Sequence, residues 1–166
     1  MNLDALRALL GAVQAGDASV DDALTRLRNL PFEDVGFARI DHHRALRTGA
    51  PEVVFAEGKT AAQVEGIVER MLAADSDVLV TRLDADKARG LPSEGYDPVS
   101  RTWARRVSGF VDRGRGLVRV VCAGTSDLPV AREALVTLAM MGNRAELTTD
   151  VGVAGLHRIL AVRELL

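Results

Sequence analysis

A short run of small and polar residues, 123–131 (AGTSDLPVA), carries the most chemical information in this sequence. It follows an apolar run, residues 117–121, and precedes an amphipathic segment that extends to Met141. This order predicts a strand, a tight turn and a helix. Such a turn exposes backbone N–H groups at a helix N-terminus, where the helix dipole favours an anion. We therefore predict an anion-binding site at this turn.

The side chains of the turn suit contacts with a nucleotide. Gly124 lets the chain turn and lets a ligand approach the backbone, and Thr125 and Ser126 add hydroxyl groups. Asp127 is a candidate to accept hydrogen bonds from ribose hydroxyls or to move a proton. Pro129 fits the first turn of the following helix. We assign ligand binding to Gly124, Thr125 and Ser126, and a catalytic role to Asp127.

A second cluster, residues 150–158 (DVGVAGLHR), follows the next candidate strand. Open α/β sheets bind ligands where parallel strands end, so both clusters are expected at one edge. Asp150 is either a helix cap or an active-site carboxylate. A helix N-terminus near Gly155 offers a second phosphate contact. His157 and Arg158 are either a helix-surface pair or a proton-transfer group and an anion contact.

Two other motifs resemble binding sites, one for a metal ion and one for a phosphate. Asp41, His42 and His43 are adjacent, and because neighbouring side chains diverge, a structural or ligand-contact role is favoured over a metal site. Residues 58–60 (GKT) resemble the end of a phosphate-binding P-loop, but that motif needs glycine where this chain has Val53. We therefore exclude a P-loop and keep Lys59 as a candidate contact for a carboxylate or phosphate.

Composition limits the class of protein. The chain has 166 residues, 48% of them hydrophobic and only 4% aromatic, so aliphatic side chains must build its core. A formal net charge of −2 argues against a nucleic-acid partner. The single cysteine, Cys122, excludes an internal disulfide framework and fits a reducing cytoplasm. No signal peptide and no apolar run of membrane-spanning length are present, so we expect a cytoplasmic protein without membrane contact.

The hydrophobic pattern predicts an α/β protein in three parts. Residues 1–32 form a helical segment, with helices to about Gln14 and over 20–30, the second ended by Pro31. Residues 33–111 form a small α/β domain, and residues 117–166 form the first part of a doubly wound parallel-sheet domain. The small domain has candidate strands at 37–40, 52–55, 78–81 and 102–107, a helix at 60–73, a short helical turn at 84–89 and a loop at 90–98. Residues 112–116 (DRGRG) are the candidate linker.

Three blocks of the sequence resemble one known family. Residues 41–60 (DHHRALRTGAPEVVFAEGKT) look like the N-terminal signature of LarB, a nickel-pincer cofactor biosynthesis family related to the PurE aminoimidazole ribonucleotide carboxylases. Residues 123–131 and 150–158 resemble its other two blocks. The resemblance extends from about residue 33 to the end of the chain. It implies a PurE-like, flavodoxin-like fold for the C-terminal part.

The resemblance also implies a reaction. LarB carboxylates C5 of the pyridinium ring of nicotinic acid adenine dinucleotide with carbon dioxide or bicarbonate, and hydrolyses the phosphoanhydride to give pyridinium-3,5-biscarboxylate mononucleotide and AMP. A thiolate that adds to the ring makes C5 nucleophilic and later leaves. The PurE relatives place a His-Arg pair in the active site, which favours proton transfer by His157 and anion contact by Arg158. We expect no tightly bound cofactor, leave Mg²⁺ open and assign no metal ligand.

The sequence departs from the family at the nucleophile. The family's cysteine follows a later glycine-rich segment that these residues lack, and Cys122 is expected to be a small buried hydrophobe. We therefore expect a C-terminally truncated member of a family whose full-length proteins are homo-oligomers. Two alternatives stay open. One is a non-catalytic nucleotide-binding module; the other is a PurE-type aminoimidazole ribonucleotide carboxylase, against which the 41–60 block argues.

Overall fold

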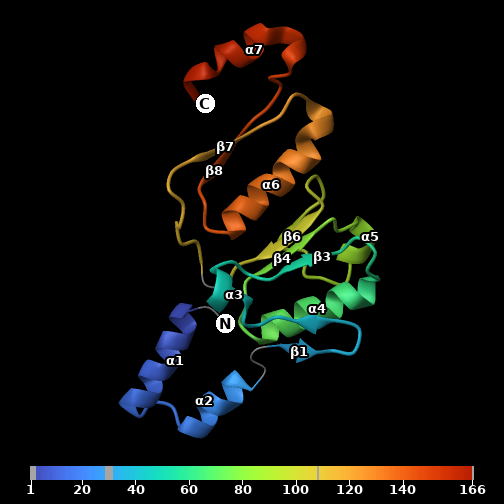
Figure 1. The fold of residues 1–166 in the computed structure, drawn as a ribbon. Helices are drawn as coiled ribbons and strands as arrows, with labels where there is room; N and C mark the ends of the chain where they lie inside the picture. Colours follow the sequence, from blue (N-terminus) through green and yellow to red (C-terminus); the bar gives the residue numbers. More distant parts are fainter. Residues whose placement is uncertain (1–2, 29–31, 108, 166) are drawn as a thin grey trace.

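The computed structural model describes residues 3–28, 32–107 and 109–165, and shows a mixed α/β protein (Figure 1). A helical hairpin comes first, a four-stranded sheet follows, and a two-stranded parallel sheet occupies the C-terminal part. The α/β class predicted from the hydrophobic pattern is confirmed. The predicted end of the second helix at Pro31 lies outside the described residues.

The N-terminal hairpin consists of α1 (Leu3–Ala15) and α2 (Val20–Leu27), which contact each other and stand apart from the sheets (Figure 1). Ser19 begins α2 with a capping box: its hydroxyl accepts from the Asp22 N–H at 3.0 Å, and the Asp22 carboxylate accepts from the Ser19 N–H at 3.2 Å. The Ser19 hydroxyl also donates to the Asp22 carboxylate at 2.7 Å, and this bond, with that from the Ser19 N–H, holds the pKa of Asp22 below its usual value. The hairpin therefore owes much of its order to local sequence.

The main sheet has the strand order β3-β4-β6-β5. Strands β3 (Val53–Phe55) and β4 (Val78–Thr81) are parallel and are joined by α4 (Ala61–Ala73). Strand β6 (Thr102–Arg105) runs antiparallel to β4, and β5 (Tyr96–Asp97) antiparallel to β6. All four residues of β4 are buried, as expected of a strand covered on both faces.

The main core lies between this sheet and α4. Trp103 is fully buried, and its indole N–H donates to the Pro92 carbonyl at 2.8 Å. Aliphatic side chains and one methionine surround it, as the low aromatic content requires: Val54, Val64, Ile67, Val68, Met71, Val78, Val80 and Leu83. The prediction of a helix at 60–73 with an apolar stripe is thus confirmed to within one residue.

Short elements account for the differences from the sequence prediction. The predicted strand at 37–40 is reduced to β2 (Arg39–Ile40), which pairs with β1 (Glu33–Asp34). The predicted loop at 90–98 is wrong at two residues, because β5 lies within it. A helix that was not predicted, α3 (Arg44–Thr48), precedes β3, and α5 (Ala85–Ala88) occupies the expected turn at 84–89.

The C-terminal part is a parallel pair of strands, β7 (Val118–Val121) and β8 (Ala145–Thr148). Helix α6 (Leu128–Met140) connects them, and α7 (Leu156–Ala161) follows β8 (Figure 1). A 3₁₀ turn precedes each helix, at Thr125–Asp127 and Val153–Gly155. This is the predicted alternation of strand, turn and helix, with Pro129 in the first turn of α6.

Helix α6 contacts both sheets, because it packs on β7 and β8 and also against β4 and β6 (Figure 1). The Arg82 guanidinium of the main sheet pairs with the Glu133 carboxylate of α6 at 3.1 Å. Arg106 donates to the Ala139 carbonyl near the other end of the helix. These contacts join the two sheets, whereas the predicted domain boundary at 112–116 stays a prediction.

Candidate functional site

An open groove lies where β7 and β8 end. It is lined by residues of the two loops that follow these strands and of the first turn of α7: Ala123, Gly124, Ser126, Asp127, Gly152, Ala154, Gly155, His157 and Arg158. The two clusters singled out in the sequence thus form one concave surface. The position agrees with the general rule that open parallel sheets bind ligands at the carboxyl ends of their strands.

The strand ladder fixes the relative position of the two loops. The Cys122 N–H donates to the Thr148 carbonyl at 3.0 Å, and the Val151 N–H donates back to the Cys122 carbonyl at 3.3 Å. Immediately beyond, Gly152 lies against Ala123: a Cβ on Gly152 would be 3.3 Å from both the Ala123 Cβ and its carbonyl oxygen. A glycine at this position lets the loops meet without a side chain between them.

The first loop is held by its own aspartate. Asp127 Oδ2 accepts from the backbone N–H groups of Ala123 and Gly124 at 3.1 and 3.0 Å, so these two donors are not free for an anion. The N–H groups of Thr125 and Ser126 take part in none of the hydrogen bonds found among the described residues. They are the donors that this helix start offers to a ligand.

After β8, the Arg158 guanidinium of α7 pairs with the Asp150 carboxylate of the preceding loop at 2.7 Å, and both side chains are largely exposed. Asp150 has a φ of 61°, a left-handed conformation that Asn and Asp tolerate better than most residues. The His157 ring folds back over Gly155, whose Cβ, if present, would lie 2.9 Å from the ring carbon Cε1. The imidazole and the guanidinium therefore both border the groove.

Three of the predicted site residues, Lys59, Thr125 and Asp150, do not line the groove. Lys59 lies outside the groove, in the turn between β3 and α4, where its N–H donates to the Ala56 carbonyl at 3.1 Å. Thr125 belongs to the first loop, although its side chain is not among those that line the groove. Cys122 is buried beneath the loop, with its thiol 3.9 Å from the Gly124 carbonyl oxygen, as expected of a small core residue.

The groove is lined by one histidine, His157, and one carboxylate, Asp127. Among the described residues no group of three or more His, Cys, Asp and Glu side chains is arranged to hold a metal ion. The roles predicted for Asp127, Asp150 and His157 in proton transfer stay predictions. Asp127 has a structural role in any case, because its carboxylate supports the loop.

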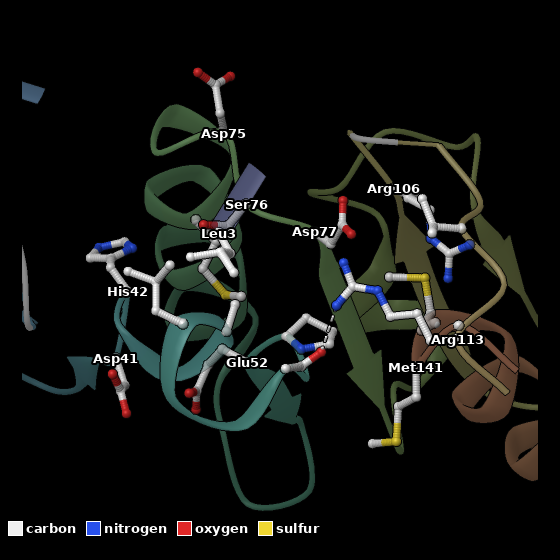
Figure 2. A pocket seen from close by; sticks show the side chains of 18 of the residues that line it. Leu3, Asp41, His42, Glu52, Asp75, Ser76, Asp77, Arg106, Arg113 and Met141 are labelled. Atoms are coloured by element: carbon white, nitrogen blue, oxygen red, sulfur yellow. Dashed lines mark hydrogen bonds between the residues drawn. The ribbon is translucent and has the colours of Figure 1, made fainter. Parts of the chain in front are cut away.

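Sequence reasoning did not find a second cavity, which lies at the other end of α6 (Figure 2). Its wall brings together residues far apart in the chain, among them His42, Glu52, Asp77, Arg113 and Met141. The adjacent Asp41 and His42 were singled out for structural or ligand contact, and both line this cavity. No local pattern joins them to Arg113 or Met141.

Comparison with known proteins accounts for the middle of the chain. Residues 32–106 match the family model of the LarB/PurE-like N-terminal domain. The match covers β1 to β6 with α4 and supports a relationship to the LarB/PurE-related carboxylases. The groove lies outside it, in residues 123–158.

A relative extends the similarity to most of the chain. The chain is 32% identical over 164 residues to the uncharacterized protein MJ0165 of Methanocaldococcus jannaschii, and the match covers 93% of this chain. It covers 64% of the relative's length, so this chain spans less than two thirds of that protein. None of the described helices combines the length and apolar character needed to cross a membrane.

Proposed function

We propose that this chain is a LarB-type protein whose groove binds the phosphate groups of nicotinic acid adenine dinucleotide. The observation that carries the proposal is the convergence of residues 123–127 and 152–158 on one groove at the carboxyl ends of two parallel strands. The N–H groups of Thr125 and Ser126, with the Arg158 guanidinium, are suited to phosphate oxygens. The family resemblance of residues 32–106 supports a carboxylase-related role.

The proposed reaction is carboxylation of the pyridinium ring at C5, coupled to hydrolysis of the phosphoanhydride. Carbon dioxide forms the new C–C bond, the C5 proton is lost to a base, and water cleaves the phosphoanhydride to release AMP. His157 borders the groove and is the residue we assign to proton transfer. The product, pyridinium-3,5-biscarboxylate mononucleotide, would serve the synthesis of a nickel-pincer cofactor.

A second candidate function is nucleotide binding without chemistry. The burial of the Cys122 thiol favours it. Ring addition by a thiolate needs an accessible cysteine, whereas Cys122, the single cysteine of the sequence, is buried beneath the first loop. A groove that holds phosphates above a buried thiol fits a binding module. The two functions share the same ligand contacts and differ only in turnover.

One experiment separates the two. The purified chain is incubated with nicotinic acid adenine dinucleotide and bicarbonate, and the products are analysed by mass spectrometry. The carboxylase proposal requires AMP and the biscarboxylate mononucleotide in catalytic amounts, and Cys122→Ala tests whether the thiol takes part. Binding of the dinucleotide without either product identifies a binding module. Absence of binding contradicts both functions.

A further inference from the structure

Asp150, in the loop after β8, is a charged residue beside the groove but not in it. Gly152 and Gly155 stand at the starts of the 3₁₀ turn and of α7, so Asp150 caps neither. Its side chain does not line the groove. Among the described residues, the hydrogen bond found for its carboxylate comes from Arg158 Nη1, at 2.7 Å. The carboxylate therefore acts on the groove through Arg158.

The backbone of Asp150 is fixed relative to the two strands. Its φ of 61° lies in the left-handed region, which glycine adopts more readily than any other residue. The next residue, Val151, is buried, and its N–H donates to the Cys122 carbonyl at 3.3 Å. A residue held in a sparsely populated conformation by its surroundings is a candidate for a functional role. Here the conformation presents a carboxylate to Arg158.

The Arg158 guanidinium is held at two points. Asp150 binds Nη1, and Nε lies beside Gly155, where a Cβ would be 3.4 Å away. No second acceptor for this guanidinium is found among the described residues, so its other N–H groups can donate within the groove that Arg158 lines. The side chain is about half exposed. Without a partner it would sample many rotamers and lose that freedom when a ligand binds.

We propose that Asp150 is a positioning residue, whose carboxylate holds the Arg158 guanidinium in the orientation that a phosphate group in the groove requires. The inference rests on the proposed phosphate-binding function of the groove. In this role Asp150 itself contacts no ligand. The ion pair is exposed and contributes little to stability, so its removal should change binding and leave folding almost unaffected. The carboxylate also repels a phosphate, but physiological salt weakens this repulsion.

Two substitutions remove the charge without opposing the backbone. Asp150→Gly deletes the carboxylate and permits a positive φ, whereas Asp150→Asn keeps a neutral acceptor and tolerates the same conformation. The probes are nicotinic acid adenine dinucleotide and inorganic pyrophosphate, which presents phosphate groups alone. In titration calorimetry at physiological salt, Asp150→Gly should weaken the binding of both about fivefold, because the guanidinium must then be ordered on binding. Asp150→Asn should weaken it less.

A matched control and two further measurements separate positioning from a loss of structure. Asp86→Asn breaks an exposed ion pair of similar length with Arg89, away from the groove, and should bind as the parent does. Thermal unfolding should give Asp150→Gly a midpoint at least as high as that of the parent, since glycine relieves the backbone strain. In an Arg158→Gln background, Asp150→Gly should not weaken binding further, because the positioned group is absent.

The outcomes distinguish this proposal from the proposed function. Weaker binding by Asp150→Gly at undiminished stability, only in chains that carry Arg158, supports the positioning role. Absence of pyrophosphate binding, pyrophosphate binding that Asp150→Gly does not weaken, an equal loss in the Arg158→Gln background, or a lower unfolding midpoint each overturns it. Pyrophosphate binding that depends on Asp150 in this way, without binding of the dinucleotide, supports the positioning role and contradicts the proposed dinucleotide function.

Discussion

Gly152 lies directly against Ala123, and this contact joins the two loops that make the groove. A Cβ on Gly152 would come within 3.3 Å of the Ala123 side chain and carbonyl oxygen, closer than ordinary packing allows. Gly124, one residue further along the same loop, has open space on its Cβ side. We therefore expect a side chain added at Gly152 to change stability more than one added at Gly124.

Gly152→Val should force the loops apart and reduce the free energy of unfolding by about 1–3 kcal/mol. Gly124→Ala should leave stability nearly unchanged, because the residue has an extended backbone at a φ of −160° and its new methyl group meets no atom of the chain. Urea unfolding followed by circular dichroism measures both. Equal stability of the two variants would show that the loop contact is unimportant.

Asp127 is predicted to matter for stability whether or not it takes part in chemistry. Its carboxylate accepts two backbone N–H groups, so Asp127→Ala should cost about 1 kcal/mol, as loss of a helix-capping acceptor does. Asp86→Ala, which removes only a highly exposed ion pair with Arg89, should have little effect. Urea unfolding of both variants measures the two effects. An unchanged midpoint for Asp127→Ala would contradict the structural role assigned to its carboxylate.

In the main sheet, Gly95 is predicted to be among the most sensitive glycines. Its φ is 101°, and a Cβ there would lie 2.5 Å from the Ala104 carbonyl oxygen. Gly95→Ala should therefore cost about 2–4 kcal/mol. Gly58 also has a positive φ, of 78°, but open space around it, so Gly58→Ala should cost only about 1 kcal/mol. Fluorescence of the single tryptophan, Trp103, reports unfolding, and equal costs would refute the steric argument.

The Glu52 carboxyl should give the free energy of unfolding a pH dependence opposite in sign to that given by most carboxylates. Burial raises its pKa in the folded chain, in spite of Arg44 and Arg47 nearby, so folding favours the protonated form. Its ionisation removes stability as the pH rises through the unfolded value, about 4.3, toward the raised folded value. Glu52→Gln should be more stable than the parent near neutral pH and close to it below that window. A constant difference at all pH values would contradict the assignment.

Local sequence predicted those elements that local interactions determine. Helix α4 was predicted to within one residue, because its apolar stripe is regular and Thr60 caps it. Strand β4 was predicted with its observed bounds from a run of apolar residues between polar ones. The turn before α6 was also predicted, since small residues, Asp127 and Pro129 are all local signals.

The remainder depends on contacts between distant residues. Strand β5 has two residues and exists only because Tyr96 pairs with Trp103, which no local pattern encodes. Helix α3 has five residues, none of them buried, and so gives no apolar stripe. The cavity that includes His42 and Arg113 is formed by segments about 70 residues apart in sequence. The position of Gly155 and Arg158 in one groove with Ser126, in contrast, could be inferred because both clusters follow neighbouring parallel strands.

The central claim is that the two loops form one phosphate-binding groove, and a titration of the chain with nicotinic acid adenine dinucleotide tests it most directly. We predict saturable binding that Ser126→Asp abolishes, because a carboxylate would stand where the phosphate binds, and that Arg158→Gln weakens about tenfold. Ser93→Asp and Arg163→Gln make the same charge changes at exposed positions outside the groove and should bind normally. Absence of binding, or binding that Ser126→Asp and Arg158→Gln leave unchanged, would contradict the account.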